Sequence, residues 1–188
     1  MNDRKRLWER SWPLDLVACP CDVQFIEYLR REGDPGKVIF HFGTGNHHTV
    51  GRRCSEPDLA HEVLGLTISK EEHETYVDLV IREPRIGHFY RVLFADIYTL
   101  TERILPRFDL VTLFHHGEFL AERRADAPHD DRTLIDLFLG KLEPGGKILF
   151  FQGSCGFKRT EPMLADFVAQ GRIAQVDEYE GLLIYEPS

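Results

Sequence analysis

The sequence lacks the features of a membrane-spanning or secreted chain. No apolar run within its 188 residues approaches the roughly 20 residues that a bilayer-spanning helix needs. The first residues are charged, and no apolar segment of the kind found in signal peptides follows them. We therefore expect a cytoplasmic protein with no membrane span.

The sequence also lacks an excess of positive charge. Its 23 Lys and Arg residues face 31 Asp and Glu residues, so the formal net charge is −8 with neutral histidines. A surface of that sign repels a phosphate backbone. We therefore expect no nucleic-acid partner, and we favour a small molecule as the substrate. The oligomeric state stays open at this point.

Cysteine is scarce, with only Cys19, Cys21, Cys54 and Cys155 in the chain. The spacing Cys19-Pro20-Cys21 is tighter than the C-x-x-C pattern of redox motifs and zinc knuckles. Disulfides are rare in the reducing cytoplasm, so we expect four reduced thiols.

No linker, internal repeat or low-complexity run divides the chain, and its length suits one domain. We expect a single domain over 1–188, with an N-terminal helical arm over 1–33 and a core over 35–188. The expected strands are 37–42, 61–68, 89–95, 108–114 and 147–151, followed by a hairpin of 173–176 and 182–185. The expected helices are 22–31, 55–60, 69–83, 98–105, 133–142 and 160–170, and 46–53 is expected to be a loop.

Strand and helix thus alternate for five units. This alternation predicts an α/β fold with a doubly wound, mostly parallel seven-stranded sheet and helices on both faces. The closely spaced last two strands predict an antiparallel hairpin at the C-terminus.

The stretch Val38 to Asn46 organises this fold, because an apolar strand runs directly into a glycine turn (residues 43–45). Gly43 and Gly45 lack a Cβ, so the backbone bends sharply there and comes close to a ligand. In an open α/β sheet, ligands bind at the carboxyl ends of the strands, near the point where the strand order reverses. The third glycine of the dinucleotide-binding fingerprint is absent.

Further segments follow in an order that resembles a known family. Val63 to Ser69 is a strand with a polar end, Phe94-Ala95-Asp96 ends in an acid, and Leu142 to Leu149 contains the turn Pro144-Gly145-Gly146. Together with Val38 to Asn46 and Phe108 to Val111, these segments resemble the class I S-adenosylmethionine (SAM)-dependent methyltransferases, a Rossmann-like superfamily. The resemblance spans about residues 35–188.

The resemblance implies SAM as the cofactor and a small molecule as the methyl acceptor. The cofactor-binding residues that it implies are Gly43, Thr44, Gly45, Asn46, Thr67 and Asp96. This chain departs from the family pattern at two places. His41 and His47 stand where the family has an acidic residue and a third glycine, and Thr67 stands where the family has the Asp or Glu that binds the ribose.

Paired histidines follow two of the predicted strands: His47 and His48 after the first, His115 and His116 after the fourth. His115 or His116 is a candidate catalytic residue that deprotonates or orients the acceptor, because an imidazole titrates near neutral pH. Alternatively, His47, His48 and His116 bind a divalent metal with Glu118. A third interpretation makes all of them polar loop residues.

Three functional hypotheses follow. The first is a SAM-dependent methyltransferase acting on a small molecule. The second is a non-catalytic protein of this fold, with a degenerate SAM site, that acts as a binding or assembly partner. The third is a metal-dependent enzyme that uses a cleft lined by these paired histidines. If the family pattern holds, residues 1–20 and 117–130 line the acceptor pocket.

Overall fold

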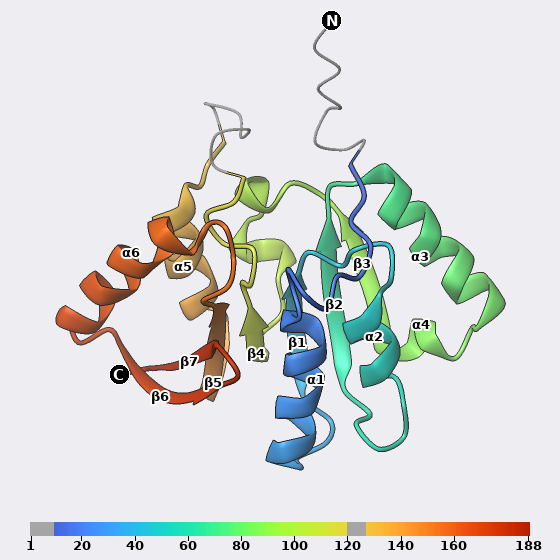
Figure 1. Ribbon diagram of the computed structural model, residues 1–188, viewed down its shortest axis with the longest axis horizontal. Helices are drawn as coiled ribbons and strands as arrows, with labels where there is room; N and C mark the ends of the chain where they lie inside the picture. The colour runs from blue at the N-terminus through green and yellow to red at the C-terminus, as the bar shows by residue number, and fades with distance from the viewer. Residues whose placement is uncertain (1–9, 120–126) are drawn as a thin grey trace, which may run out of the picture.

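A computed structural model describes residues 10–119 and 127–188 of the chain. Its seven strands form one sheet in the order β3-β2-β1-β4-β5-β7-β6 (Figure 1). The strands are β1 (Val38–Phe42), β2 (Glu62–Thr67), β3 (Tyr90–Phe94), β4 (Phe108–Thr112), β5 (Leu142–Phe151), β6 (Ile173–Tyr179) and β7 (Leu182–Pro187). β1 to β5 are parallel, and β7 pairs antiparallel with both β5 and β6. The predicted fold class and the C-terminal hairpin are confirmed.

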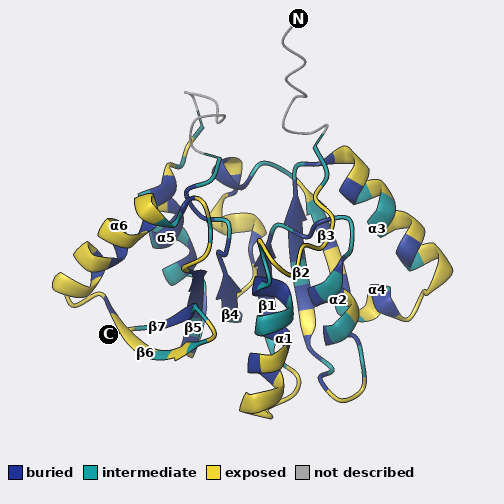
Figure 2. Ribbon diagram, in the orientation of Figure 1, coloured by how far each residue is buried: buried dark blue, intermediate teal, exposed yellow. Residues whose placement is uncertain are grey.

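Helices cover both faces of this sheet. They are α1 (Cys21–Glu32), α2 (Thr49–Cys54), α3 (Lys70–Arg82), α4 (Ile86–Phe89), α5 (Asp131–Leu139) and α6 (Phe157–Ala169), with short 3₁₀ helices η2 (Ile97–Thr99) and η3 (Glu102–Ile104). Side chains alternate between the faces along β1, so that Phe40 packs with α5 and α6 while Ile39 packs with α1 and α2. Figure 2 shows the buried central strands between exposed helix surfaces.

The strand order reverses between β1 and β4, which places the glycine turn at the switch point of the sheet. A strap of residues 10–20 crosses this carboxyl edge before α1 begins. The backbone carbonyl of Trp12 accepts a hydrogen bond of 3.0 Å from the Asn46 amide, and the Trp12 amide donates one of 3.1 Å to Glu72. The strap is therefore tied to the glycine turn on one side and to α3 on the other.

The prediction of a loop over 46–53 was wrong, because α2 begins at Thr49. α2 has only six residues, which is too short to show a helical periodicity in the sequence. Val50 and Cys54 are among its buried residues. Gly51 faces β3 so closely that a Cβ there would lie 2.3 Å from the ring of Tyr90. A glycine that looked like a loop residue is thus the position where a short helix approaches the sheet.

The helix expected at 55–60 is absent, and only turns occupy that segment. Ser55 closes α2 instead of starting a new helix, because its hydroxyl donates to the carbonyl of Gly51 at 2.7 Å. The helix expected at 98–105 is replaced by η2 and η3. Leu100 and Leu105 are both buried, and the extended backbone at each of them ends a 3₁₀ turn.

The start of β5 and the presence of α4 also differ from the expectation. β5 begins at Leu142 and not at Lys147, because the chain stays extended and Leu142 already pairs with Phe108 of β4. The short helix α4 was not predicted. Across the described residues, no helix combines the length and apolarity required to cross a membrane.

Candidate functional site

A cavity of about 420 Å³ opens at the carboxyl edge of the sheet. Ligand pockets for small molecules fall in the range of roughly 300–1,000 Å³. Its walls come from the strap, the glycine turn, the ends of β2 and β3, the loop after β4, and residues 153–155. The two segments expected to line an acceptor pocket, 1–20 and 117–130, both contribute to it through their described parts; residues 1–9 and 120–126 lie outside the description.

The glycine turn forms the floor of one end of the cavity. Gly43 and Gly45 have φ of +87° and +55°, a region that side chains disfavour. A Cβ on Gly43 would lie 2.6 Å from the His115 ring, and one on Gly45 would lie 2.9 Å from the Trp12 carbonyl oxygen. Glycine is therefore required at both positions for steric reasons as well as for the turn.

The structure brings only part of the predicted cofactor set to the cavity. Four members line it, namely Gly43, Gly45, Thr67 and Asp96. Thr44 does not line the cavity, because it is buried against β2. A Cβ built on Gly65 of β2 would lie 2.8 Å from the methyl group of Thr44. Asn46 is also outside the lining, and its amide is held by the strap.

A carboxylate that sequence reasoning missed stands at the end of β2. The Thr67 hydroxyl donates to Glu72 Oε2 at 2.6 Å, and the Trp12 amide donates to Oε1 at 3.1 Å. Glu72 is buried in the cavity wall, and burial raises the pKa of its carboxyl although these two donors oppose the shift. In the sequence, Glu72 completes a helix-capping pattern with Ser69, and that pattern concealed its direction toward Thr67.

Asp96 has two roles at the end of β3. It caps η2, because its Oδ1 accepts a hydrogen bond of 3.0 Å from the Tyr98 amide. It also lines the cavity together with Ile97 and Tyr98. The structural role and the cofactor-binding role predicted for Asp96 are thus compatible.

The paired histidines do not converge. His48 is buried, with one ring nitrogen 3.0 Å from the Tyr90 hydroxyl and the other 2.9 Å from the Thr75 hydroxyl. His116 is equally buried, between Thr160 Oγ1 and the carbonyl oxygen of Asp131, each at 2.8 Å. Because both nitrogens of each ring are engaged, the set of His47, His48, His116 and Glu118 does not form a metal centre in this structure.

His115 is the histidine of the second pair that lines the cavity. Its Nδ1 lies 3.2 Å from Glu118 Oε1, which also accepts a hydrogen bond of 2.7 Å from the Ser154 hydroxyl. Burial alone would lower the pKa of His115, but the Glu118 carboxylate outweighs it and raises this pKa to about 9. Glu118 thus fixes both the orientation and the charge of the ring.

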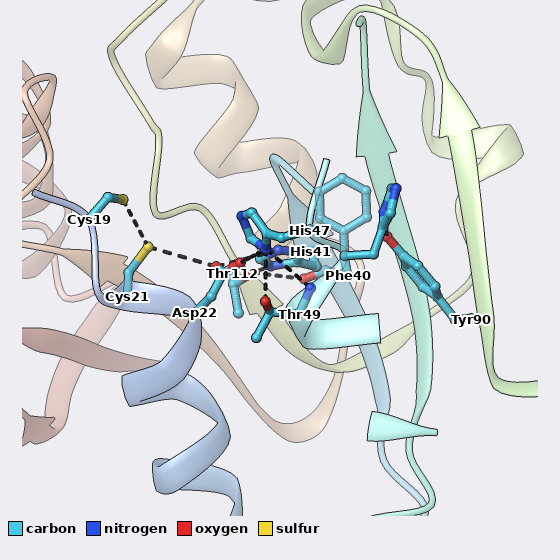
Figure 3. A network of polar contacts seen from close by, with 10 residues as sticks. Cys19, Cys21, Asp22, Phe40, His41, His47, Thr49, Tyr90 and Thr112 are labelled. Carbon is cyan, nitrogen blue, oxygen red and sulfur yellow. Dashed lines mark hydrogen bonds and ion pairs between the residues drawn. The ribbon is translucent and has the colours of Figure 1, made fainter. Parts of the chain in front are cut away.

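Two thiols lie beside His115 at the same end of the cavity. Cys19 Sγ and Cys21 Sγ are 3.3 Å apart, and Cys21 Sγ lies 3.8 Å from Asp22 Oδ1 (Figure 3). The hydrogen bond from Cys21 lowers the pKa of Cys19 to about 6, although burial opposes this shift. Burial also raises the pKa of Asp22 to about 7. All four cysteines of the chain are free thiols in the structure.

His41 occupies the position where the family resemblance would place an acid. It is buried in β1, and its Nδ1 lies 2.8 Å from Thr112 Oγ1. The Thr112 hydroxyl in turn donates to the Phe40 carbonyl oxygen at 3.3 Å. Nε2 faces Asp22 Oδ1 at 3.6 Å, so an acid does lie close to the end of β1, but it comes from α1.

Acidification is expected to destabilise the protein partly through His41. Burial, followed by the nearby His115 and His47, lowers the pKa of His41 from 6.5 to about 3. The unfolded chain therefore binds a proton that the folded chain does not, and stability falls as the pH drops below 6.5. His41→Gln is expected to remove up to about 1.4 kcal/mol of this loss per pH unit. Urea unfolding between pH 7 and pH 4.5 measures the slope.

His88→Gln is the control for this prediction, because His88 is exposed on α4. Asp22 changes the pH dependence of stability in the opposite sense, since its raised pKa adds stability as the pH falls from about 7. Asp22 is present in the wild type and in both variants, so its contribution cancels in the comparison. An identical pH slope in wild type and His41→Gln would contradict the prediction.

Comparisons with known proteins agree on the fold. No protein-family model matches the sequence, and no curated protein matches it. Among solved structures, the N-methyltransferase NodS from Bradyrhizobium japonicum, in complex with S-adenosylhomocysteine (SAH), superposes with a TM-score of 0.62 at 14% identity over 96% of this chain and 94% of that one. Magnesium protoporphyrin IX methyltransferase from Synechocystis, with bound SAM, gives 0.64 at 12% identity over 90% and 79%.

A protein named for another reaction shares the same architecture. Precorrin-8w decarboxylase from Methanobacterium thermoautotrophicum superposes with a TM-score of 0.58 at 14% identity over 89% of this chain and 90% of that one. At these identities the likeness concerns the fold, which is that of the class I SAM-dependent methyltransferases. A shared fold does not by itself assign the reaction, which depends on the residues of the site.

Proposed function

We propose that this chain, which has the class I methyltransferase fold, transfers a methyl group from SAM to a small-molecule acceptor. One observation carries the proposal: a single cavity joins a glycine floor at the switch point of the sheet to a cluster of reactive polar groups after β4. Such an arrangement binds a donor and an acceptor side by side, and holding two reactants in line supplies much of the rate of a transfer reaction.

The residues at the cofactor end fit SAM. The methionine part would lie over Gly43 and Gly45, which line the cavity and leave no room for a Cβ. Thr67 and Glu72 would face the ribose, and Asp96 would lie on the adenine side. When bound, SAM supplies an activated methyl group on its sulfonium.

Glu72 can supply the carboxylate that the family pattern has at the end of the second strand, where this chain has Thr67. A carboxylate offers about four lone-pair sites, and Thr67 and Trp12 use two of them. The remaining sites are available to the ribose hydroxyls, and hydrogen bonds to a carboxylate are roughly twice as strong as those to a neutral group. Thr67 then acts by orienting Glu72. This argues against the alternative of a non-catalytic protein with a degenerate SAM site.

The acceptor would occupy the part of the cavity between the strap and the loop after β4, next to the glycine turn, because His115 lies against Gly43. His115 is the candidate that orients or deprotonates it, because this ring lines the cavity and is held by Glu118. His116, the other candidate from the sequence, lies behind the cavity wall with both nitrogens engaged. The strap and Phe119 would exclude water from the acceptor, since Trp12 packs edge-to-face on Phe119 at 6.0 Å.

Calorimetric titration of the purified protein with SAM and with SAH tests this proposal. We expect one site per chain with a dissociation constant of roughly micromolar, which corresponds to about −8 kcal/mol. A folded protein that releases no binding heat with either ligand would overturn the proposal. Binding of SAM alone leaves the acceptor to be found by screening small molecules for methyl transfer.

A further inference from the structure

Three potential metal ligands meet at the acceptor end of the cavity, from two distant parts of the chain. The sulfurs of Cys19 and Cys21 and one ring nitrogen of His115 all lie within 4.8 Å of one another. In the part of the chain that the structure describes, no other group of three such residues comes this close. This group was not predicted from the sequence, because the Cys-x-Cys spacing is unusual and the histidine is far away in the chain.

The sulfur spacing fits a tetrahedral zinc ion. Two thiolates at about 2.3 Å from Zn²⁺ lie roughly 3.8 Å apart in a tetrahedral arrangement. Cys19 Sγ and Cys21 Sγ are 3.3 Å apart. The two sulfurs therefore have to move apart by only a few tenths of an ångström to bind the ion. Cys21 is fixed at the first turn of α1, whereas Cys19 belongs to the half-buried strap, which is where such a shift is easiest.

The surroundings of His115 resemble those of a metal-bound imidazole. Metal-ligating histidines almost always donate their second ring N–H to a carboxylate or carbonyl, which fixes the ring orientation. Here His115 Nδ1 lies 3.2 Å from Glu118 Oε1, and Glu118 is itself held by Ser154. With this contact kept, an ion would be bound through Nε2. Asp22 adds a second carboxyl beside Cys21 and favours a divalent cation at this place.

We propose that Cys19, Cys21 and His115 bind Zn²⁺, or a similar thiophilic divalent cation, with the fourth coordination position open to the cavity. Three protein ligands with one open position are typical of catalytic zinc sites, whereas structural sites have four. Binding of the ion itself does not depend on SAM.

The open position gives the ion a role in the proposed methyl transfer. This role rests on the proposed function, whereas binding of the ion does not. A thiol or hydroxyl of the acceptor that occupies the fourth position loses its proton to solvent more readily, because the ion stabilises the anion. The anion then forms the bond to the methyl group as the methyl–sulfur bond of SAM breaks and SAH leaves. His115 would thus orient the acceptor through the ion.

The test is a titration of chelator-treated, reduced protein with Zn²⁺ in competition with a chromophoric chelator, and with Co²⁺ as a spectroscopic probe. We expect one ion per chain and, with Co²⁺, the charge-transfer absorption of cobalt–thiolate bonds. Cys19→Ser and Cys21→Ser should each weaken Zn²⁺ binding at least 100-fold, because even the loss of a supporting residue costs about 10–100-fold. Glu118→Gln should weaken it by about 10–100-fold.

Cys155→Ser is the matched control, since Cys155 lines the same cavity but lies outside the group of three. It should retain the wild-type affinity within about 3-fold. Absence of a cobalt–thiolate band in the folded wild type would overturn the proposal whether or not the variants fold, and so would unchanged Zn²⁺ affinity in both single-cysteine variants. Because no SAM is added, failure here is distinguishable from failure of the methyltransferase proposal.

Discussion

Replacing Gly45 with arginine is expected to remove measurable binding of SAM and SAH, a loss of at least about 100-fold, or roughly 2.7 kcal/mol. Gly45 has φ +55°, and the space that a Cβ would occupy is bounded by the His47 ring at 2.3 Å and by the Trp12 carbonyl at 2.9 Å. An arginine side chain therefore has to displace the strap or enter the cavity where the cofactor would lie. Calorimetric titration with SAH measures the loss.

The matched control is Gly36→Arg. Gly36 has φ +80°, a comparable backbone strain, but nothing lies within 4 Å of a Cβ built on it. It should bind SAH like the wild type once circular dichroism shows that both variants are folded. Wild-type affinity in Gly45→Arg would place the ligand away from the glycine turn and contradict the assignment.

Glu72→Gln is expected to weaken SAM binding by about 10–100-fold, the second-largest effect. The substitution keeps the size of the side chain but removes the charge and turns one acceptor oxygen into a donor. Hydrogen bonds to charged groups contribute about 1.5–3 kcal/mol each, and the ribose hydroxyls would lose this acceptor. Calorimetry with SAM, at a temperature where the variant is fully folded, gives the change in affinity.

Glu71→Gln serves as the control for this variant, because Glu71 precedes Glu72 on α3 and is exposed. It removes the same charge from the same helix turn without touching the cavity. Equal SAM affinities for Glu72→Gln and Glu71→Gln would show that the buried carboxylate does not reach the cofactor.

The fold was predictable from the sequence because its signals are local. Apolar strands alternate with amphipathic helices, and turn residues such as Pro144 and Gly145 separate them. The same local signals located the glycine turn and Asp96 at strand ends. The short helix α2 escaped, because six residues carry too little periodicity and Gly51 suggested a loop.

The polar part of the site was less predictable, because tertiary contacts create it. Glu72 reaches Thr67 only because the strap fixes its carboxylate through Trp12. Cys19 and Cys21 lie 96 and 94 positions before His115 in the chain, and no sequence pattern joins them. Within each histidine pair, the first member lines the cavity and the second is buried. The turn that follows each strand sets the direction of each ring, and the sequence does not encode that direction locally.

A crystal structure of the protein with SAH locates the cofactor and the acceptor end in one measurement. We expect the homocysteine part over Gly43 and Gly45, the ribose within hydrogen-bond distance of Glu72, and the sulfur directed toward Cys19 and His115. SAH bound outside this cavity, or with its ribose away from the end of β2, would contradict the assignment of the cofactor and of the acceptor end together.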